Sequence, residues 1–312
     1  MSATLSLKQS SLSCIFFLLP LLCSAAHSSP FGFLKDLQGS QKGDVVEGVS
    51  ELKQYLKKFG YIDNDHTQNP QPDKEDNDHF DDTLESAIKL YQHNYRIMST
   101  GVLDAKTVEN MMLPRCGVPD IINGRSRMRA ARNDMHDVKS LHTVLHYQFF
   151  SGSPKWPTDK SNLTYKFAPG TPDDAMTVIS GAFDKWAGVT QFTFVNVQDA
   201  VPSVEVPDIM IGFYSGDHGD GSPFDGPYGV LAHASPPTAG TFHLDEDEPW
   251  SIGPNPGHID METVALHEIG HLLGLQHSSV QDAVMYPSVT DGVTKDLCGD
   301  DVQGIMELYA NV

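Results

Sequence analysis

The residues of this chain best suited to chemistry are three histidines and a glutamate at fixed spacing: His267, Glu268, His271 and His277. Residues four apart lie on the same face of an α-helix, so His267 and His271 can offer two imidazoles to one metal ion, with Glu268 beside them. Gly274 can adopt a backbone conformation that other residues resist, and a bend there would bring back His277 as a third nitrogen ligand. Three protein ligands and an open fourth position are typical of catalytic zinc.

A second group of candidate metal ligands precedes this motif. His218, Asp220, His233 and His243 supply three nitrogens and one carboxylate, a closed tetrahedral set that suits structural zinc. Oxygen ligands in the same stretch would form a cage suited to calcium. They are the carboxylates of Asp225, Asp245 and Glu248 and the backbone carbonyls of Gly226, Tyr228 and Val230. The alternative is a polar surface loop, which explains scattered acids but not three histidines at these positions.

One cysteine lies in a short segment that cannot join a helix or a central strand. Residues Pro114 to Asp120 contain two prolines and a glycine, which hold the chain extended. A thiolate is a good zinc ligand, so Cys116 could occupy the fourth position of the catalytic zinc and exclude water. A disulfide between Cys116 and Cys298 is the alternative in an oxidising compartment.

Taken together, these motifs resemble the matrixins, or matrix metalloproteinases, of the metzincin clan. Pro114 to Asp120 matches the family's cysteine switch, in which Arg115 and Asp120 pair to brace the loop. Ser278 after the third histidine is also typical of matrixins. The resemblance further implies a Met-turn at Met285, and the second zinc and calcium in the stretch from His218 to Glu248. Asp208 corresponds to a position that helps to bind another calcium in the family, but the shorter His233–His243 spacing departs from the family pattern at that site. The resemblance is closest to plant-type members without a haemopexin-like domain.

Composition and the N-terminus indicate a secreted protein. The formal net charge of -20 over 312 residues argues against nucleic acid or an anionic membrane as a partner. Residues 1–26 have the basic, apolar and small-residue regions of a secretory signal, and no apolar run is long enough to span a membrane. Asn162 begins the one N-glycosylation sequon. We therefore expect an extracellular protein, in the extracellular space or the cell wall.

Helical periodicity divides the rest of the chain. Residues 27–43 show no periodicity and are expected to lack regular structure, whereas helices are predicted at about 45–59, from 82 and at 104–112. This three-helix module, about 44–113, resembles a peptidoglycan-binding-like module. With the switch at 114–120 and a linker at 121–147, it forms a propeptide of 27–147. The catalytic domain is then 148–312, an α+β fold whose mostly parallel five-stranded sheet and three helices follow from the resemblance.

The sequence thus predicts a secreted zinc endopeptidase that is made as a zymogen. Glu268 would act as general base towards a zinc-bound water, and Cys116 would be the fourth zinc ligand in the latent form. Its partners would be extracellular protein or peptide substrates and an activating protease, and we expect a monomer. The alternative is a non-catalytic secreted protein that binds zinc and the wall or matrix, but a structural zinc needs no general base such as Glu268.

Overall fold

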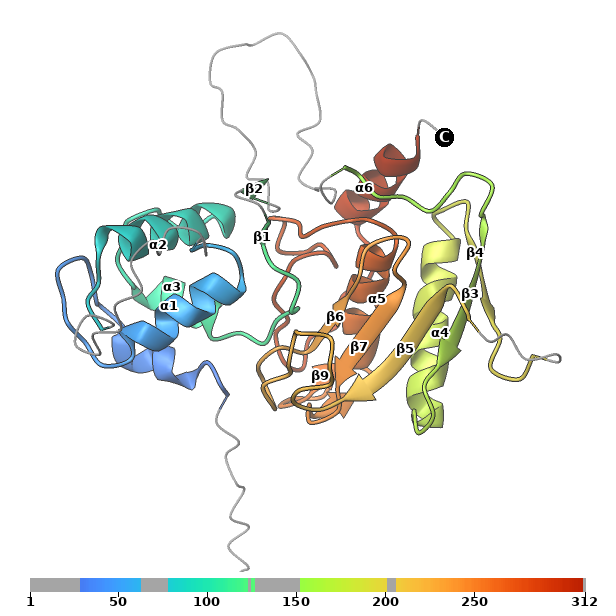
Figure 1. Ribbon diagram of the computed structural model, residues 1–312, viewed down its shortest axis with the longest axis horizontal. Coiled ribbons are helices and arrows are strands. Elements are labelled where there is room, and N and C mark those ends of the chain that lie inside the picture. Colours follow the sequence, from blue (N-terminus) through green and yellow to red (C-terminus); the bar gives the residue numbers. More distant parts are fainter. Residues whose placement is uncertain (1–28, 63–77, 123–124, 127–151, 201–205, 311–312) are drawn as a thin grey trace, which may run out of the picture.

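The structure of the chain is a computed structural model that describes residues 29–62, 78–122, 125–126, 152–200 and 206–310. The predicted signal, most of the linker and the acidic part of the loop before the second helix lie outside these residues. A helical module lies beside a larger part that is built around a sheet, and an extended segment joins the two (Figure 1).

The module contains the three predicted helices, α1 (Val49–Lys58), α2 (Asp82–Asn94) and α3 (Ala105–Met111). Two of them begin at an aspartate that accepts a hydrogen bond from the first turn: Asp81 caps α2 and Asp104 caps α3. The first helix begins four residues later than predicted. Gly48 adopts a left-handed conformation with φ 99°, and Val45 is exposed and forms a β-bridge to His79.

The prediction that residues 27–43 lack regular structure is wrong for residues 32–37. These residues form a 3₁₀-helix, η1 (Gly32–Leu37), and Leu34 and Leu37 are completely buried in the core of the module. A 3₁₀-helix has three residues per turn, so Phe31, Leu34 and Leu37 lie on one face. A pattern of three apolar residues spaced three apart is too short to be recognised as α-helical periodicity.

The larger part is organised on a five-stranded sheet with the order β4-β3-β5-β7-β6. Four strands are parallel, and β6 at the edge runs antiparallel to β7. The strands are β3 (Asn162–Phe167), β4 (Thr193–Asn196), β5 (Ile209–Tyr214), β6 (Ala232–Ala234) and β7 (Thr241–Asp245). Two short pairs complete the strands: β1 (Ile121–Ile122) with β2 (Arg125–Ser126), and β8 (Trp250–Ser251) with β9 (Ile259–Asp260).

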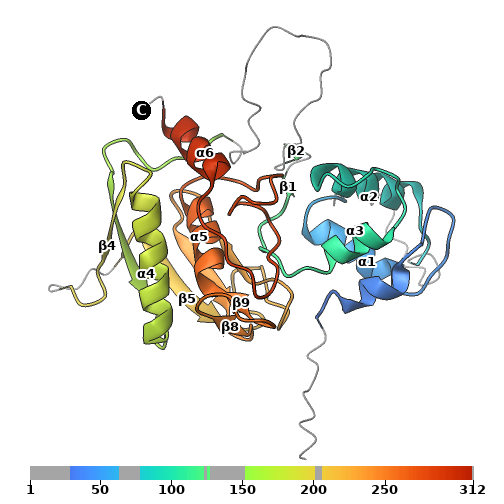
Figure 2. The same ribbon diagram turned by 180° about the vertical axis from the view of Figure 1, so that it is seen from behind.

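Helices α4 (Asp173–Ala187) and α5 (Met261–Leu272) pack together against the sheet, and α6 (Gly299–Tyr309) follows at the C-terminal end (Figure 2). The Trp186 side chain of α4 is completely buried and donates a hydrogen bond to the backbone oxygen of Leu266 in α5 at 2.9 Å. The predicted α+β class, with a mostly parallel five-stranded sheet, is confirmed. Within the described residues, no helix is both long and apolar enough to cross a membrane.

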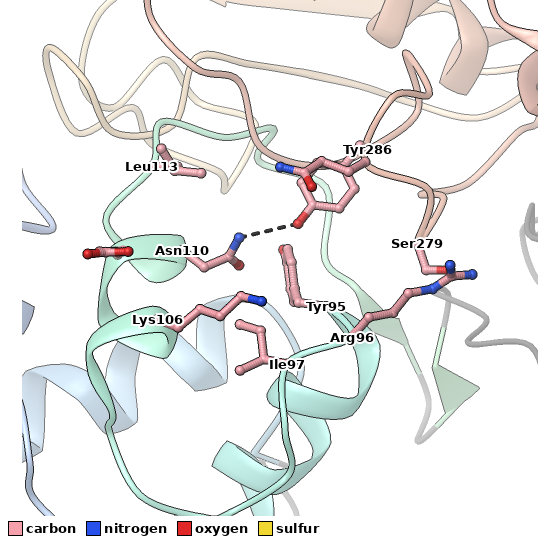
Figure 3. A pocket seen from close by; sticks show the side chains of 10 residues that line it. Tyr95, Arg96, Ile97, Lys106, Asn110, Leu113, Ser279 and Tyr286 are labelled. Carbon is pink, nitrogen blue, oxygen red and sulfur yellow. Dashed lines mark hydrogen bonds between the residues drawn. The ribbon is translucent and has the colours of Figure 1, made fainter.

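The helical module docks directly on the sheet-containing part. Phe224, Val230 and Tyr286 of the larger part join the apolar core of the module. Asn110 of α3 donates a hydrogen bond to the Tyr286 hydroxyl at 3.2 Å. Asn110 and Tyr286 line a cavity of about 470 Å³ between the two parts, and the Lys106 side chain points into this cavity (Figure 3). The module therefore contacts the residue that directly follows Met285.

Candidate metal centre

Helix α5 presents the first two histidines and the glutamate. Asp260 caps the helix by accepting hydrogen bonds from the Thr263 backbone and hydroxyl, which fixes where it begins. His267 and His271 follow two and three turns later on one face, and their Nε2 atoms are 3.1 Å apart. Glu268 is fully buried beside them. The four-residue spacing brings the two imidazoles together as the helix geometry requires.

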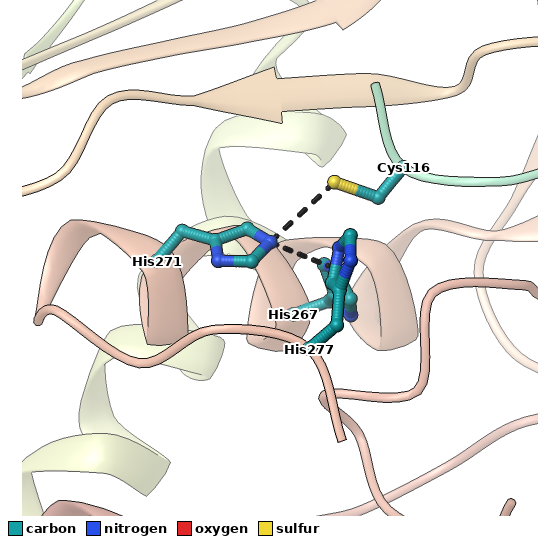
Figure 4. Close-up of side chains that lie close together, drawn as sticks. All are labelled: Cys116, His267, His271 and His277. Atoms are coloured by element: carbon teal, nitrogen blue, oxygen red, sulfur yellow. Dashed lines mark hydrogen bonds between the residues drawn. The ribbon is translucent and has the colours of Figure 1, made fainter. Parts of the chain in front are cut away.

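Gly274 provides the bend that the sequence suggested. Its φ is +103°, a left-handed conformation, and a Cβ at this position would lie 2.5 Å from the backbone oxygen of Pro154. Past the bend, His277 returns towards the helix: its ring centroid is 5.2 Å from that of His267 and 4.9 Å from that of His271. The three imidazoles therefore surround one point (Figure 4).

Met285 lies beneath the histidine helix in the position expected of a Met-turn. A Cβ on Gly270 would lie 2.3 Å from the Met285 sulfur, so the glycine allows this close packing. The turn is held by Asp301 of α6, whose carboxylate accepts hydrogen bonds from the backbone nitrogens of Val284 and Met285 at 3.0 and 3.1 Å. The last helix thus fixes the floor of the histidine cluster.

The segment that contains Cys116 lies like an additional strand between residues 229–232 on one side and residues 287–289 on the other. On one side, the backbone of Arg115 bonds to Gly229 and Leu231 next to the edge strand β6, and the Gly117 nitrogen donates to the Ala232 oxygen. On the other side, the Cys116 nitrogen donates to the Pro287 oxygen, and the Val289 nitrogen donates to the Pro114 oxygen, all at 2.8–2.9 Å. The segment fills the backbone positions that a peptide strand would need.

This arrangement places the Cys116 sulfur at the histidine cluster, 3.5 Å from His271 Nε2 (Figure 4). The ligand atoms of Cys116, His267, His271 and His277 all lie within 4.8 Å of one another. Three imidazole nitrogens and a thiol, buried together, are the donor set and geometry that tetrahedral zinc prefers. Cys116 and Cys298 are both free thiols, so the alternative disulfide is not formed.

Arg115 and Asp120 form a completely buried ion pair. The guanidinium donates to both carboxylate oxygens, at 2.9 and 3.1 Å, and its carbon lies 3.5 Å from the Phe59 ring centroid. The hydroxyls of Tyr61 and Tyr95 donate to the same carboxylate at 2.9 and 3.2 Å. Burial opposes ionisation, but Arg115 and then His277 hold the pKa of Asp120 well below its usual range.

Electrostatics favour the metal-binding form of His267. Burial and the neighbouring His271 and His277 hold the pKa of His267 well below its usual value, so its ring is neutral and can ligate. Burial raises the pKa of Glu268 to about 8, with a smaller opposing effect from Cys116. Burial, together with the Glu268 charge, raises the pKa of the Cys116 thiol well above normal. A dication among these groups would favour the ionised carboxylate and the thiolate.

The second predicted cluster also converges. His218 Nε2, His233 Nε2 and His243 Nδ1 each lie 2.8–3.0 Å from the same oxygen of Asp220. Burial lowers the pKa of His233 to about 4, which keeps it neutral near pH 7. Burial acts to raise the pKa of Asp220, yet hydrogen bonds from the Ser222 backbone and His233 hold it well below normal. Three imidazoles and a carboxylate fit a closed zinc site.

The predicted calcium ligands come from two segments, residues 225–230 before β6 and residues 245–248 at the end of β7 and just after it, but several already have partners. The Glu248 carboxylate accepts hydrogen bonds from the backbone nitrogens of Tyr228 and Gly229, and Asp225 accepts one from Val230. Burial and neighbouring acids raise the pKa of Glu248 to about 7 and that of Asp245 to about 6. Gathered carboxylates of this kind suit a hard cation.

The helical module also contacts two of the predicted calcium ligands. Lys58 of α1 forms an ion pair with Asp225 at 3.1 Å, and the Ser29 hydroxyl donates to the Tyr228 carbonyl at 2.8 Å. Two groups that the sequence assigned to calcium are therefore in contact with the predicted propeptide.

Two remaining predicted positions lie at the other end of the sheet. Asp208 forms an ion pair with Lys160, and its second oxygen accepts bonds from the backbone nitrogen and hydroxyl of Thr164, each at 2.9 Å. Its carboxylate thus links β3 to the start of β5, and a calcium ion would compete with these groups. Asn162 is exposed at the start of β3, where a glycan would have room.

A narrow cavity opens beside the histidine cluster. Its lining includes Cys116, Leu231, Val264, Glu268 and Val289. The side chain of Val289, at the position where matrixins usually have tyrosine, therefore forms part of the wall next to the candidate reaction centre. The lining is mostly apolar, with His267 and Glu268 as its polar members.

The fold, with its histidine helix, bend and Met-turn, defines a zinc-dependent metallopeptidase. A family model described as Matrixin matches residues 155–310, and one described as Putative peptidoglycan binding domain matches residues 46–111. Metalloendoproteinase 2-MMP of Arabidopsis thaliana is 44% identical over 285 aligned positions, and the match covers 87% of this chain and 73% of that protein. Metalloendoproteinase 1 of Glycine max is 39% identical, over 96% of this chain and 95% of the soybean protein.

Matrix metalloproteinase-16 of Homo sapiens is 38% identical over 73% of this chain and 37% of its own length. The chain belongs to the matrixin family and is a zinc metalloendopeptidase that is similar to the plant metalloendoproteinases. The resemblance inferred from the motifs is confirmed, and the non-catalytic alternative loses its basis. The family model that matches residues 46–111 also confirms the resemblance of the helical module to a peptidoglycan-binding-like domain.

Sequence reasoning missed several residues that support the site. Phe59, Tyr61 and Tyr95 surround the Arg115–Asp120 pair, and Asp301 holds the Met-turn. These aromatic residues lie just after the ends of α1 and α2 and give the signal of an ordinary apolar core, which does not reveal that they contact a buried ion pair. In the sequence, Asp301 has only the signature of an acid in the first turn of a helix.

Proposed function

We propose that this protein is a secreted zinc endopeptidase that is made as a latent zymogen and acts on extracellular proteins. The observation that carries the proposal is the convergence of His267, His271, His277 and Cys116, with Glu268 buried beside them. The first three residues would hold the catalytic zinc, and Cys116 would hold its fourth position until the segment leaves. The proposed division is a signal at 1–26, a propeptide at 27–147 and a catalytic domain at 148–312.

Zinc, when bound at this site, would act as a Lewis acid: it would polarise the scissile carbonyl and lower the pKa of a water molecule in its open position. Glu268 accepts a proton from that water and then donates it to the leaving amine. The edge strand orients the substrate: Gly229, Leu231 and Ala232 offer the backbone groups that the inhibitory segment uses in the latent form. The apolar cavity beside Glu268 would receive the side chain after the scissile bond.

Latency follows from two kinds of contact. The Cys116 thiol fills the place that water needs, and the backbone of residues 114–117 fills the strand position that substrate needs. The buried Arg115–Asp120 pair keeps the segment in this conformation. Cleavage of the linker by an activating protease would let the module and the segment leave, as exposed linkers are the usual sites of nicking.

The other predicted metal sites complete the proposal. His218, Asp220, His233 and His243 would hold a structural zinc, and Asp225, Asp245 and Glu248 would bind calcium. The ligands of both sites come from the segment before β6, from β6 and β7 themselves and from the residues just after β7, next to the strand beside which substrate would lie. Their ions would stabilise the substrate-binding edge rather than take part in the reaction.

The direct test compares the processed protein with its Glu268→Ala variant on a quenched peptide library. Loss of a general base is expected to lower kcat by about 10²–10⁴ while the zinc content is unchanged. A variant with full activity would overturn the mechanism. A matched control is Glu262→Ala, an acid on an exposed part of the same helix that pairs with Lys185 and should leave kcat unchanged.

A further inference from the structure

The structure assigns a second task to Asp120: it is the hydrogen-bond partner that the propeptide supplies to the third zinc ligand, His277. The inference rests on the proposed zinc centre. In this account the propeptide acts on the metal site at two points, since Cys116 fills the open position and Asp120 sets the orientation and basicity of His277. Asp120 is thus a positioning residue and not only the brace for Arg115.

The geometry distinguishes His277 from the other two histidines. His267 Nδ1 lies 2.7 Å from the Val284 carbonyl, and His271 Nδ1 lies 2.9 Å from the Leu275 carbonyl. His277 Nδ1 lies 2.8 Å from an Asp120 carboxylate oxygen. Each acceptor requires a proton on Nδ1, which leaves Nε2 of each ring for the metal. Two of the acceptors belong to the catalytic domain, but the third belongs to the propeptide.

The burial of this pair makes the contact strong. Asp120 is completely buried, and His277 is 1% exposed. The Asp120 carboxylate stays ionised because Arg115 contacts it through two nitrogens, and the hydroxyls of Tyr61 and Tyr95 also donate to it. A carboxylate in this position raises the basicity of a ligating imidazole and fixes its orientation more firmly than a carbonyl does. His277 is therefore the most strongly supported of the three ligands while the propeptide is docked.

Activation then changes the metal site twice. When the segment leaves, the thiol is removed from the fourth position and the carboxylate is removed from His277. His267 and His271 keep their acceptors because Val284 and Leu275 remain in the catalytic domain. A less basic His277 donates less charge to zinc, which leaves a stronger Lewis acid. By thermodynamic reciprocity, if docked Asp120 tightens zinc binding, zinc tightens the docking of the propeptide.

The first test is nitrogen-15 NMR of the zinc-loaded zymogen with labelled histidine, before and after proteolytic removal of the propeptide. Each ring is assigned through bonds to its own backbone. We expect a protonated Nδ1 on all three rings, with the His277 proton furthest downfield. On removal, the His277 Nδ1 proton should exchange away or shift the most, whereas His267 and His271 keep theirs because their carbonyl acceptors stay in place. A His277 signal that does not change, or a His277 ring without an Nδ1 proton in the zymogen, would overturn the inference.

The second test measures the transfer of zinc from the zymogen to a chelator in Asp120→Asn, which keeps the shape but removes the charge. Loss of such a partner typically costs 10–100-fold in metal affinity, so we expect transfer to be faster by about that factor. Tyr61→Phe is the matched control, because it removes one hydrogen bond to the same carboxylate and keeps the charge. Equal rates in the two variants would contradict the assignment.

Cobalt substitution separates this inference from the proposed function. A thiolate-to-cobalt absorption band in the cobalt-loaded zymogen reports that Cys116 ligates the metal. If the wild-type zymogen lacks the band, the proposed latent centre is wrong. If Asp120→Asn alone loses the band, the variant has released the segment, and its zinc-transfer rate no longer reports on His277. The NMR comparison on the wild-type protein then decides whether Asp120 is the partner of His277.

Discussion

Replacing Arg115 by methionine tests whether one buried ion pair holds the inhibitory segment in place. Arg115 is 1% exposed and Asp120 is completely buried, so the substitution strands a carboxylate away from water. Breaking a buried pair in this way costs about 3–5 kcal/mol. We expect the lower end, about 3 kcal/mol, because Tyr61, Tyr95 and His277 still bond to Asp120. At 1.36 kcal/mol per factor of ten, the released fraction of the segment rises about a hundredfold.

The assay is the labelling rate of the Cys116 thiol, which a reagent reaches only when the segment is released. A Glu268→Gln background prevents self-cleavage, and Cys298→Ser removes the other free thiol, which is half-buried at the start of α6. When release is fast relative to labelling, the rate follows the released fraction. Arg115→Met should therefore be labelled about a hundred times faster than its parent.

The matched control is Lys53→Met in the same module. Lys53 pairs with Asp81 at 2.8 Å, but both side chains are partly exposed. Such pairs contribute about 0–1 kcal/mol, and this one is remote from the segment, so labelling should change little. If Arg115→Met is labelled less than three times faster than the parent, the buried pair does not brace the segment.

Three further predictions follow from the site. Cys116→Ser should give a zymogen that cleaves its own linker during purification, seen by mass spectrometry; one that stays intact and latent would refute the switch. Gly274→Ala should lower the Tm by more than Gly253→Ala: both glycines have positive φ, but only at Gly274 would the new Cβ meet backbone, the Pro154 oxygen at 2.5 Å, and equal losses would show that the bend is not tightly packed. Asn110→Leu should speed Cys116 labelling by a few-fold to about tenfold, because the lost hydrogen bond to Tyr286 contributes about 0.5–1.5 kcal/mol to docking; an unchanged rate would mean that this contact does not hold the module.

Much of the histidine helix could be predicted because its chemistry is local. The spacing of His267 and His271 follows from the helical repeat, and Gly274 was a visible break in it. Three short β-branched or aromatic runs in the sequence, at 163–167, 192–195 and 209–213, correspond to β3, β4 and β5, with ends displaced by one residue. The first helix was extended too far because Gly48 was not recognised as its start.

The contacts between the proposed propeptide and the sheet-containing part could not be predicted from the sequence. Asp120 and His277 are 157 residues apart, Lys58 and Asp225 are 167 apart, and Asn110 and Tyr286 are 176 apart. No periodicity connects such pairs, since they arise from how two folded parts dock. The resemblance to matrixins implied the pairing of Arg115 with Asp120, but it gave no indication that the same carboxylate reaches a histidine of the metal centre.

The most direct test of the central claim is zinc X-ray absorption of the zymogen before and after the propeptide is removed. With both proposed zinc sites loaded, the zymogen should show a sulfur neighbour at about 2.3 Å, on average one for every two zinc ions, among imidazole nitrogens at about 2.0–2.1 Å. After removal, the sulfur should be replaced by a light atom while the imidazoles remain. A zymogen without zinc-bound sulfur, or a processed enzyme that retains it, would contradict the account.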